Sequence, residues 1–87
     1  MEKISIVLND YHHVDEALDD LCQKFSFQRN QIHSVEDFEK KLLDINEDRI
    51  VEIRQNDTLS DDILVFQKVF EFVQLHNDHI YVVRGIG

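Results

Sequence analysis

The chain has 87 residues, a length typical of one small domain, and 43% of them are hydrophobic, a usual share for a folded globular protein. Its 18 acidic and 9 basic residues give a formal net charge of −9, which repels the phosphates of nucleic acids and of anionic membranes. No apolar segment reaches the roughly 18 residues of a membrane helix. Length, charge and hydropathy together predict a single domain over residues 1–87 that binds neither nucleic acid nor membrane.

Cysteine usage points to a reducing compartment. The one cysteine, Cys22, excludes an intramolecular disulfide, and a secreted domain of this size usually depends on such a bond. No leader with a charged and then an apolar region opens the sequence, since residues 1–9 hold only a short apolar run broken by Ser5. We therefore expect a cytoplasmic protein.

The first 25 residues predict a strand followed by a helix. Residues 3–8 are mostly β-branched or apolar, which is typical of a strand, here one buried on most of both faces. From residue 10 or 13 to residue 25, apolar side chains recur at helical spacing, with acidic side chains on the opposite side. Cys22 lies within the apolar stripe, where it needs no reactive role.

A loop and the start of a second helix follow. Residues 26–33 show no clean period and predict a loop with two apolar anchors, Phe27 and Ile32. Ser34 then begins the helix, because its hydroxyl can accept a hydrogen bond from the backbone N–H of Asp37 while the Asp37 carboxylate reaches back.

The remaining elements alternate between strand and helix. The stripe of the second helix extends to Ile45, and Arg49–Arg54 reads as a short strand with one partly solvated face. Residues 60–75 hold more apolar surface than any other segment and predict the long helix around which the other elements pack. Residues 80–83 give the last strand.

The predicted order is strand, helix, helix, strand, helix, strand. Strands joined through helices are typical of a parallel sheet with right-handed connections. We therefore expect a small α/β domain in which a three-stranded parallel sheet packs with three helices in two layers or, in part, three.

Motifs of catalysis or metal binding are not evident in the sequence. Both glycines fall in the last three residues, so a glycine-rich phosphate loop is excluded, and no nucleophile elbow is present. His76, Asp78 and His79 lie close together without the spacing of a metal site, and the helix dipole favours a histidine near a helix C-terminus. We expect neither an enzyme nor a bound cofactor or metal.

Residues 31–42 resemble the second helix of the barstar family of ribonuclease inhibitors, and residues 50–55 resemble that family's middle strand. The order of elements, the length and the acidity of the whole chain also look like barstar. The positions that follow the helix pattern are Ser34 at the cap, Glu36 at the first acid, and Val35, Phe38 and Leu42 at the apolar positions. Lys40 stands where the family has its second acid.

In that family a loop and the helix after it present acidic residues that plug the active site of a basic nuclease. The resemblance and the negative charge together imply a small inhibitor or immunity protein that neutralises a basic protein toxin, in the first place a nuclease. We expect it to act as a monomer rather than a homodimer. The predicted partner-binding residues are Gln28, Arg29, Asn30, Gln31, His33, Glu36, Asp37 and Glu39.

Two other functions stay open at this point. Three apolar side chains remain after the predicted core is filled: Leu64, Leu75 and Tyr81. An apolar surface of this kind is typical of an oligomerising or adaptor module. A ligand-binding or enzymatic domain would instead need a pocket at the rim beyond the carboxyl ends of the strands, near Asp10 and Asp57.

Overall fold

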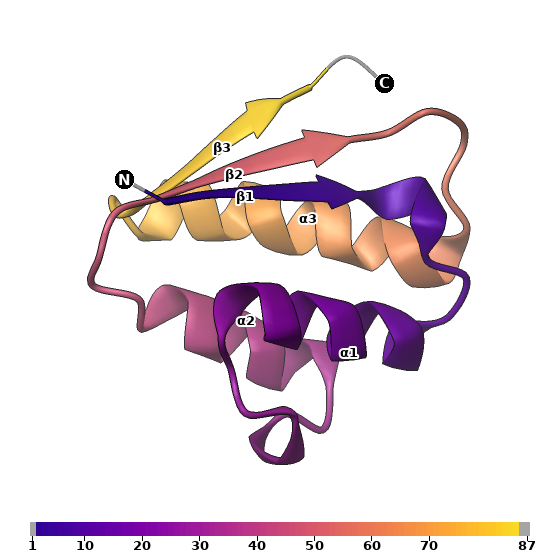
Figure 1. Cartoon of the computed structure of the whole chain (residues 1–87). Coiled ribbons are helices and arrows are strands. Elements are labelled where there is room, and N and C mark those ends of the chain that lie inside the picture. The colour runs from indigo at the N-terminus through magenta and orange to yellow at the C-terminus, as the bar shows by residue number, and fades with distance from the viewer. Residues whose placement is uncertain (1, 86–87) are drawn as a thin grey trace.

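A computed structural model describes residues 2–85 (Figure 1). The elements are β1 (Glu2–Val7), the 3-10 turn η1 (Leu8–Asp10), α1 (Val14–Phe25), the 3-10 turn η2 (Arg29–Gln31), α2 (Val35–Leu43), β2 (Arg49–Arg54), α3 (Asp61–His76) and β3 (Ile80–Arg84). The predicted order of strands and helices is confirmed. Leu8 belongs to η1 rather than to the first strand, and α2 ends at Leu43, two residues before Ile45.

The three strands form one parallel sheet in the order β1-β2-β3, as predicted. Ile4 of β1 lies opposite Val51 of β2, and Val51 lies opposite Val82 of β3. β2 is the central strand, and its Val51 and Ile53 are buried in the core.

All three helices lie on one face of the sheet, so the domain has two layers (Figure 1). Along β1, Ile4 and Ile6 are buried, whereas Lys3 and Ser5 are exposed. The expectation that the first strand is buried on most of both faces is therefore wrong. No helix covers the second face of the sheet in the described chain, and side chains alternate between the core and solvent.

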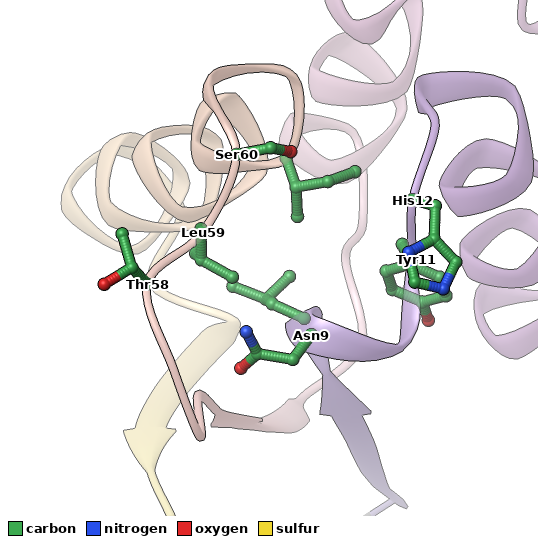
Figure 2. Close-up of a pocket in the computed structure, with 8 residues that line it drawn as sticks. Asn9, Tyr11, His12, Thr58, Leu59 and Ser60 are labelled. Atoms are coloured by element: carbon green, nitrogen blue, oxygen red, sulfur yellow. The ribbon is translucent and has the colours of Figure 1, made fainter.

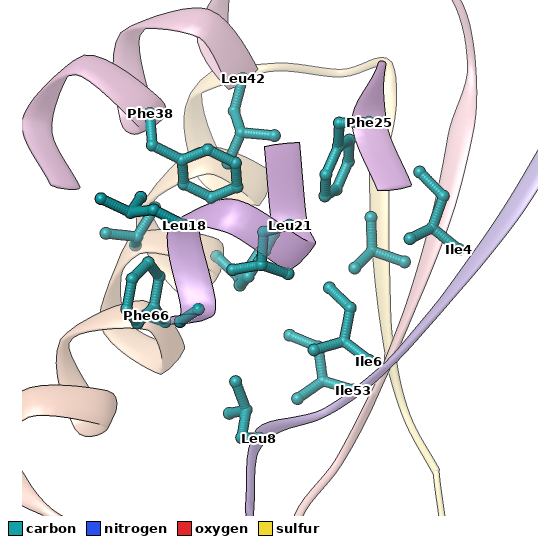
Figure 3. Close-up of a cluster of buried hydrophobic side chains, with 14 of the residues drawn as sticks. Ile4, Ile6, Leu8, Leu18, Leu21, Phe25, Phe38, Leu42, Ile53 and Phe66 are labelled. Atoms are coloured by element: carbon teal, nitrogen blue, oxygen red, sulfur yellow. The ribbon is translucent and has the colours of Figure 1, made fainter. Parts of the chain in front are cut away.

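The core lies between the sheet and the helices (Figure 3). Phe38 of α2 is fully buried, and its ring meets those of Phe25, Phe66 and Phe70 edge-on, with centroids 5.9, 6.2 and 6.1 Å apart. This one ring joins α2 to both other helices. Among residues 2–85, no helix is both long enough and apolar enough to span a bilayer.

The turn after α3 fixes the end of α2. Asn77 is only 6% exposed, and its Nδ2 lies 2.9, 3.2 and 3.0 Å from the carbonyl oxygens of Leu42, Leu43 and Ile45. Its Oδ1 accepts a hydrogen bond from the backbone N–H of His79 at 2.9 Å. The last carbonyls of a helix have no partner within the helix, so Asn77 supplies one from a distant part of the chain.

Candidate functional site

The connection between α1 and α2 projects beyond the helices, on the side away from the sheet (Figure 1). Ile32 is fully buried, and the ring of Phe27 stacks on that of Phe25 with centroids 5.6 Å apart. The two predicted anchors of this loop are thus confirmed. Within residues 28–33 the exposed side chains are Gln28, Asn30, Gln31 and His33.

Arg29 points from the loop back to α1. Its Nε donates to Oδ1 of Asp19 at 2.7 Å, and its Nη2 lies 3.6 Å from Oδ1 of Asp15. Its Nη1 donates to the carbonyl oxygen of Ile32. One guanidinium therefore ties the loop to α1, an internal role that the sequence did not predict for this residue.

Ser34 caps α2 as predicted. Its Oγ accepts from the backbone N–H of Asp37 at 3.2 Å. The Asp37 carboxylate reaches back to the backbone N–H of His33 at 2.9 Å, so these side chains satisfy two donors at the start of the helix. Asp37 is half-buried, and its charge lies in the first turn, where the helix dipole favours it.

Carboxylates from both helices surround this connection. The outer side of α1 holds a shallow depression of about 630 Å³ that is lined mostly by acids. We call the surface formed by α1, the 28–33 loop and the start of α2 the acidic face. Its carboxylates are Asp15, Glu16, Asp19, Asp20, Glu36, Asp37 and Glu39. The α1 acids were not among the predicted site residues, although their place opposite the apolar stripe was visible in the sequence.

Asp20 is held from two sides. The hydroxyl of Tyr11 donates to its Oδ2, and Nζ of Lys24 lies 3.9 Å from the same oxygen. Burial and then the Asp20 carboxylate raise the pKa of Tyr11, so the hydroxyl keeps its proton. Asp20 therefore contributes charge to the acidic face while its side chain stays fixed.

A cavity of about 230 Å³ lies at the carboxyl ends of β1 and β2, between η1 and the start of α3 (Figure 2). Asn9 closes one side: its Oδ1 accepts from the backbone N–H groups of Asn56 and Asp57 at 2.6 and 3.2 Å, and its Nδ2 donates to the carbonyl of Asp57 at 3.2 Å. Its described lining contains no carboxylate. Asn9 thus joins the loops that follow β1 and β2.

The possible metal ligands of the described chain are its histidines, Cys22 and the carboxylates. Within residues 2–85, no group of three or more His, Cys, Asp or Glu side chains is placed to hold a metal ion. His79 pairs with Asp48, Nδ1 to Oδ1 at 3.0 Å, whereas the ring of His76 lies 4.2 Å from that of Phe72 between centroids. Burial raises the pKa of the Cys22 thiol, which keeps it protonated in the core.

The structure divides the predicted partner-binding residues into three sets. Glu36 and the four polar side chains of the loop are exposed; Arg29 and Asp37 are bonded to neighbouring segments; Glu39 is half-buried. All of them belong to the acidic face or border it. No protein-family model, no curated protein and no solved structure matches the chain.

Proposed function

We propose that the protein is a small acidic inhibitor or immunity protein that binds a basic toxin, in the first place a nuclease, and blocks its active site. The acidic face and the net charge of −9 support a cationic partner. The order of elements and the three-stranded parallel sheet agree with the barstar resemblance of residues 31–42. The reduced, buried Cys22 is compatible with action in the cytoplasm.

The observation that carries this proposal is that the acidic face already binds a guanidinium. The Asp19 and Asp15 carboxylates lie 2.7 and 3.6 Å from nitrogens of Arg29, which comes from a different segment. Nucleases hold the phosphates of their substrate with arginine and lysine. In the proposed complex, cations of this kind from the partner meet Glu36 and the α1 carboxylates.

In the proposed complex, electrostatic attraction raises the association rate, and the loop provides shape complementarity to the partner. Opposite charges on two proteins raise the association rate and contribute less to the final affinity. The exposed amides of Gln28, Asn30 and Gln31 stand at the tip of the connection, where they can hydrogen-bond to the rim of a cleft. Such a loop enters the cleft meant for the nucleic acid, and the carboxylates on either side take the place of phosphates.

Lys40 distinguishes the proposed partner from those of the barstar family. It is exposed on α2 at the position where that family has its second acid. A cation there repels the cations of a phosphate site, so the partner is expected to present an acidic or neutral group opposite it.

A panel of small basic ribonucleases tests the proposal. We expect the protein to slow RNA cleavage by at least one of them. The E36Q/E39Q double variant should then associate about tenfold more slowly at low ionic strength, with a flatter salt dependence. Asp37 is kept in this variant because its carboxylate caps α2.

The matched control is D61N/D62N, which removes the same charge from the exposed first turn of α3. It should associate nearly as fast as the wild type, because these acids lie outside the acidic face. If no nuclease in the panel is inhibited, the proposed function is wrong. If both double variants slow association equally, the proposed site is wrong.

A further inference from the structure

The outer side of α3 carries a stripe of four residues at spacings of four, three and four: Leu64, Lys68, Glu71 and Leu75. At about 100° per residue, these spacings keep all four on one side of the helix. Leu75 is 77% exposed, Lys68 and Glu71 are exposed, and Leu64 is half-buried. The opposite side of α3 faces the core. We call these four residues the α3 stripe.

The α3 stripe is complementary to itself when one copy is reversed. A two-fold axis midway between Lys68 and Glu71 brings a second α3 alongside in the antiparallel direction. Leu64 of each copy then faces Leu75 of the other, and Lys68 of each faces Glu71 of the other, so every contact is made twice. A parallel arrangement in register would instead set Lys68 against Lys68 and Glu71 against Glu71, which is unfavourable.

We infer that the α3 stripe is a docking surface for a second copy of this chain, packed as an antiparallel two-fold dimer. Charge complementarity selects the partner and the direction, and two leucine pairs supply the apolar contact. Phe72, 43% exposed, lies beside the stripe and widens this contact. Arg84 of β3 holds the Glu71 carboxylate at 2.7 Å, which orients it before the partner arrives.

The dimer leaves the acidic face free. Arg84 places the α3 stripe next to the β3 edge of the sheet, whereas the acidic face belongs to α1, the 28–33 loop and α2. The inference is therefore independent of the proposed function, although it departs from the monomer expected from the sequence. One helix stripe covers less than the roughly 800 Å² per partner of a standard interface, so the dimer is weak.

Sedimentation equilibrium from micromolar to millimolar concentration tests the inference. The average mass of the wild type should rise towards that of a dimer. L75E should weaken association about tenfold or more, because it places a carboxylate where two leucines meet. A wild type that stays monomeric throughout the range, or a dimer that L75E leaves unchanged, overturns the inference.

A mixing experiment tests whether charge pairing across the α3 stripe holds the two copies together. The K68E chain has acidic side chains at both charged positions of the stripe, and the E71K chain has basic side chains at both. Each variant alone should be monomeric, whereas an equimolar mixture should dimerise at least as strongly as the wild type, because both charge pairs are restored. A mixture that remains monomeric overturns the proposed geometry.

Two controls change the net charge by the same amounts at other exposed positions. K41E on α2 and D44K just after α2 should each dimerise as the wild type does. Far-UV circular dichroism and urea midpoints close to those of the wild type show that the stripe variants are folded. If K41E or D44K abolishes the dimer as K68E and E71K do, net charge rather than the α3 stripe controls association, and the inference is wrong.

Discussion

The connections that follow α1 and α3 change the direction of the chain by different means. After α1, the 28–33 loop stays at the surface, tied down by Arg29 and by two apolar anchors. After α3, the turn is organised around the amide of Asn77, which is buried and lies near three carbonyls of the α2 end. One connection is held by ion pairs at the surface together with apolar anchors, and the other by a buried neutral amide.

The two connections are expected to contribute differently to stability. A buried carbonyl that loses its partner is costly, so the turn at Asn77 has little freedom to change. An exposed ion pair contributes little to stability, because water and salt compete for both charges. The carboxylates that hold Arg29 can therefore accept another cation without loss of the fold, as the proposed inhibitor requires.

Replacing Asn77 should have the largest effect. N77A leaves the carbonyls of Leu42, Leu43 and Ile45 without this donor, and we expect the free energy of unfolding to fall by about 3 kcal/mol. Urea denaturation followed by circular dichroism measures the loss. N46A, in the exposed loop after α2, is the matched control and should change stability little. A loss below about 1 kcal/mol in N77A would remove the contrast between the two connections.

Tyr11 provides an intermediate case, since its buried hydroxyl is bonded to a carboxylate that is partly exposed. We expect Y11F to lose about 1.5 kcal/mol at neutral pH. The raised pKa of Tyr11 means that its contribution is complete below the ordinary tyrosine pKa of about 10 and is lost as the pH rises beyond it. Urea unfolding at increasing alkaline pH should show this fall in the wild type and a smaller one in Y11F.

The cap of α2 should contribute less. S34A removes the acceptor for the backbone N–H of Asp37 and should destabilise the protein by about 1 kcal/mol. S60A is a matched control, because Ser60 occupies the equivalent position on α3 without a side-chain hydrogen bond to the described helix. Equal losses in the two variants, measured by urea denaturation, would show that the hydroxyl of Ser34 does not act as a cap.

The smallest change in stability is expected for R29A. R29A removes the pairs with Asp15 and Asp19 and the hydrogen bond to the Ile32 carbonyl. Because water can reach these groups in part, the unfolding free energy should fall by less than about 1 kcal/mol. Amide hydrogen exchange of residues 28–33 should nevertheless become faster, since the loop loses its tie to α1. K24A is the control, because it removes another exposed pair on α1 outside the loop. Unchanged exchange in R29A would mean that the apolar anchors alone position the loop.

The helix cap and the loop anchors of the candidate site were predicted from local sequence signals, whereas the α1 acids were not. The spacing of Ser34 and Asp37 indicated the cap of α2, and Phe27 and Ile32 stood out as the apolar residues of an irregular segment. Both signals involve neighbours in the chain. The partners of Arg29 could not be identified in this way, because Asp19 lies ten residues away on another element and meets it only after the loop has folded back.

The sequence by itself determined the order of strands and helices, because the spacing of apolar residues differs between a helix and a strand. That order in turn predicted the parallel sheet, and the composition determined the negative charge. The tertiary structure decided which face of the sheet is covered, so that Ile4 is buried while Lys3 is exposed. It also decided that Asn77 closes α2 across a separation of 35 residues to Leu42. These contacts depend on how distant elements pack, and packing is a property of the whole fold rather than of any single segment.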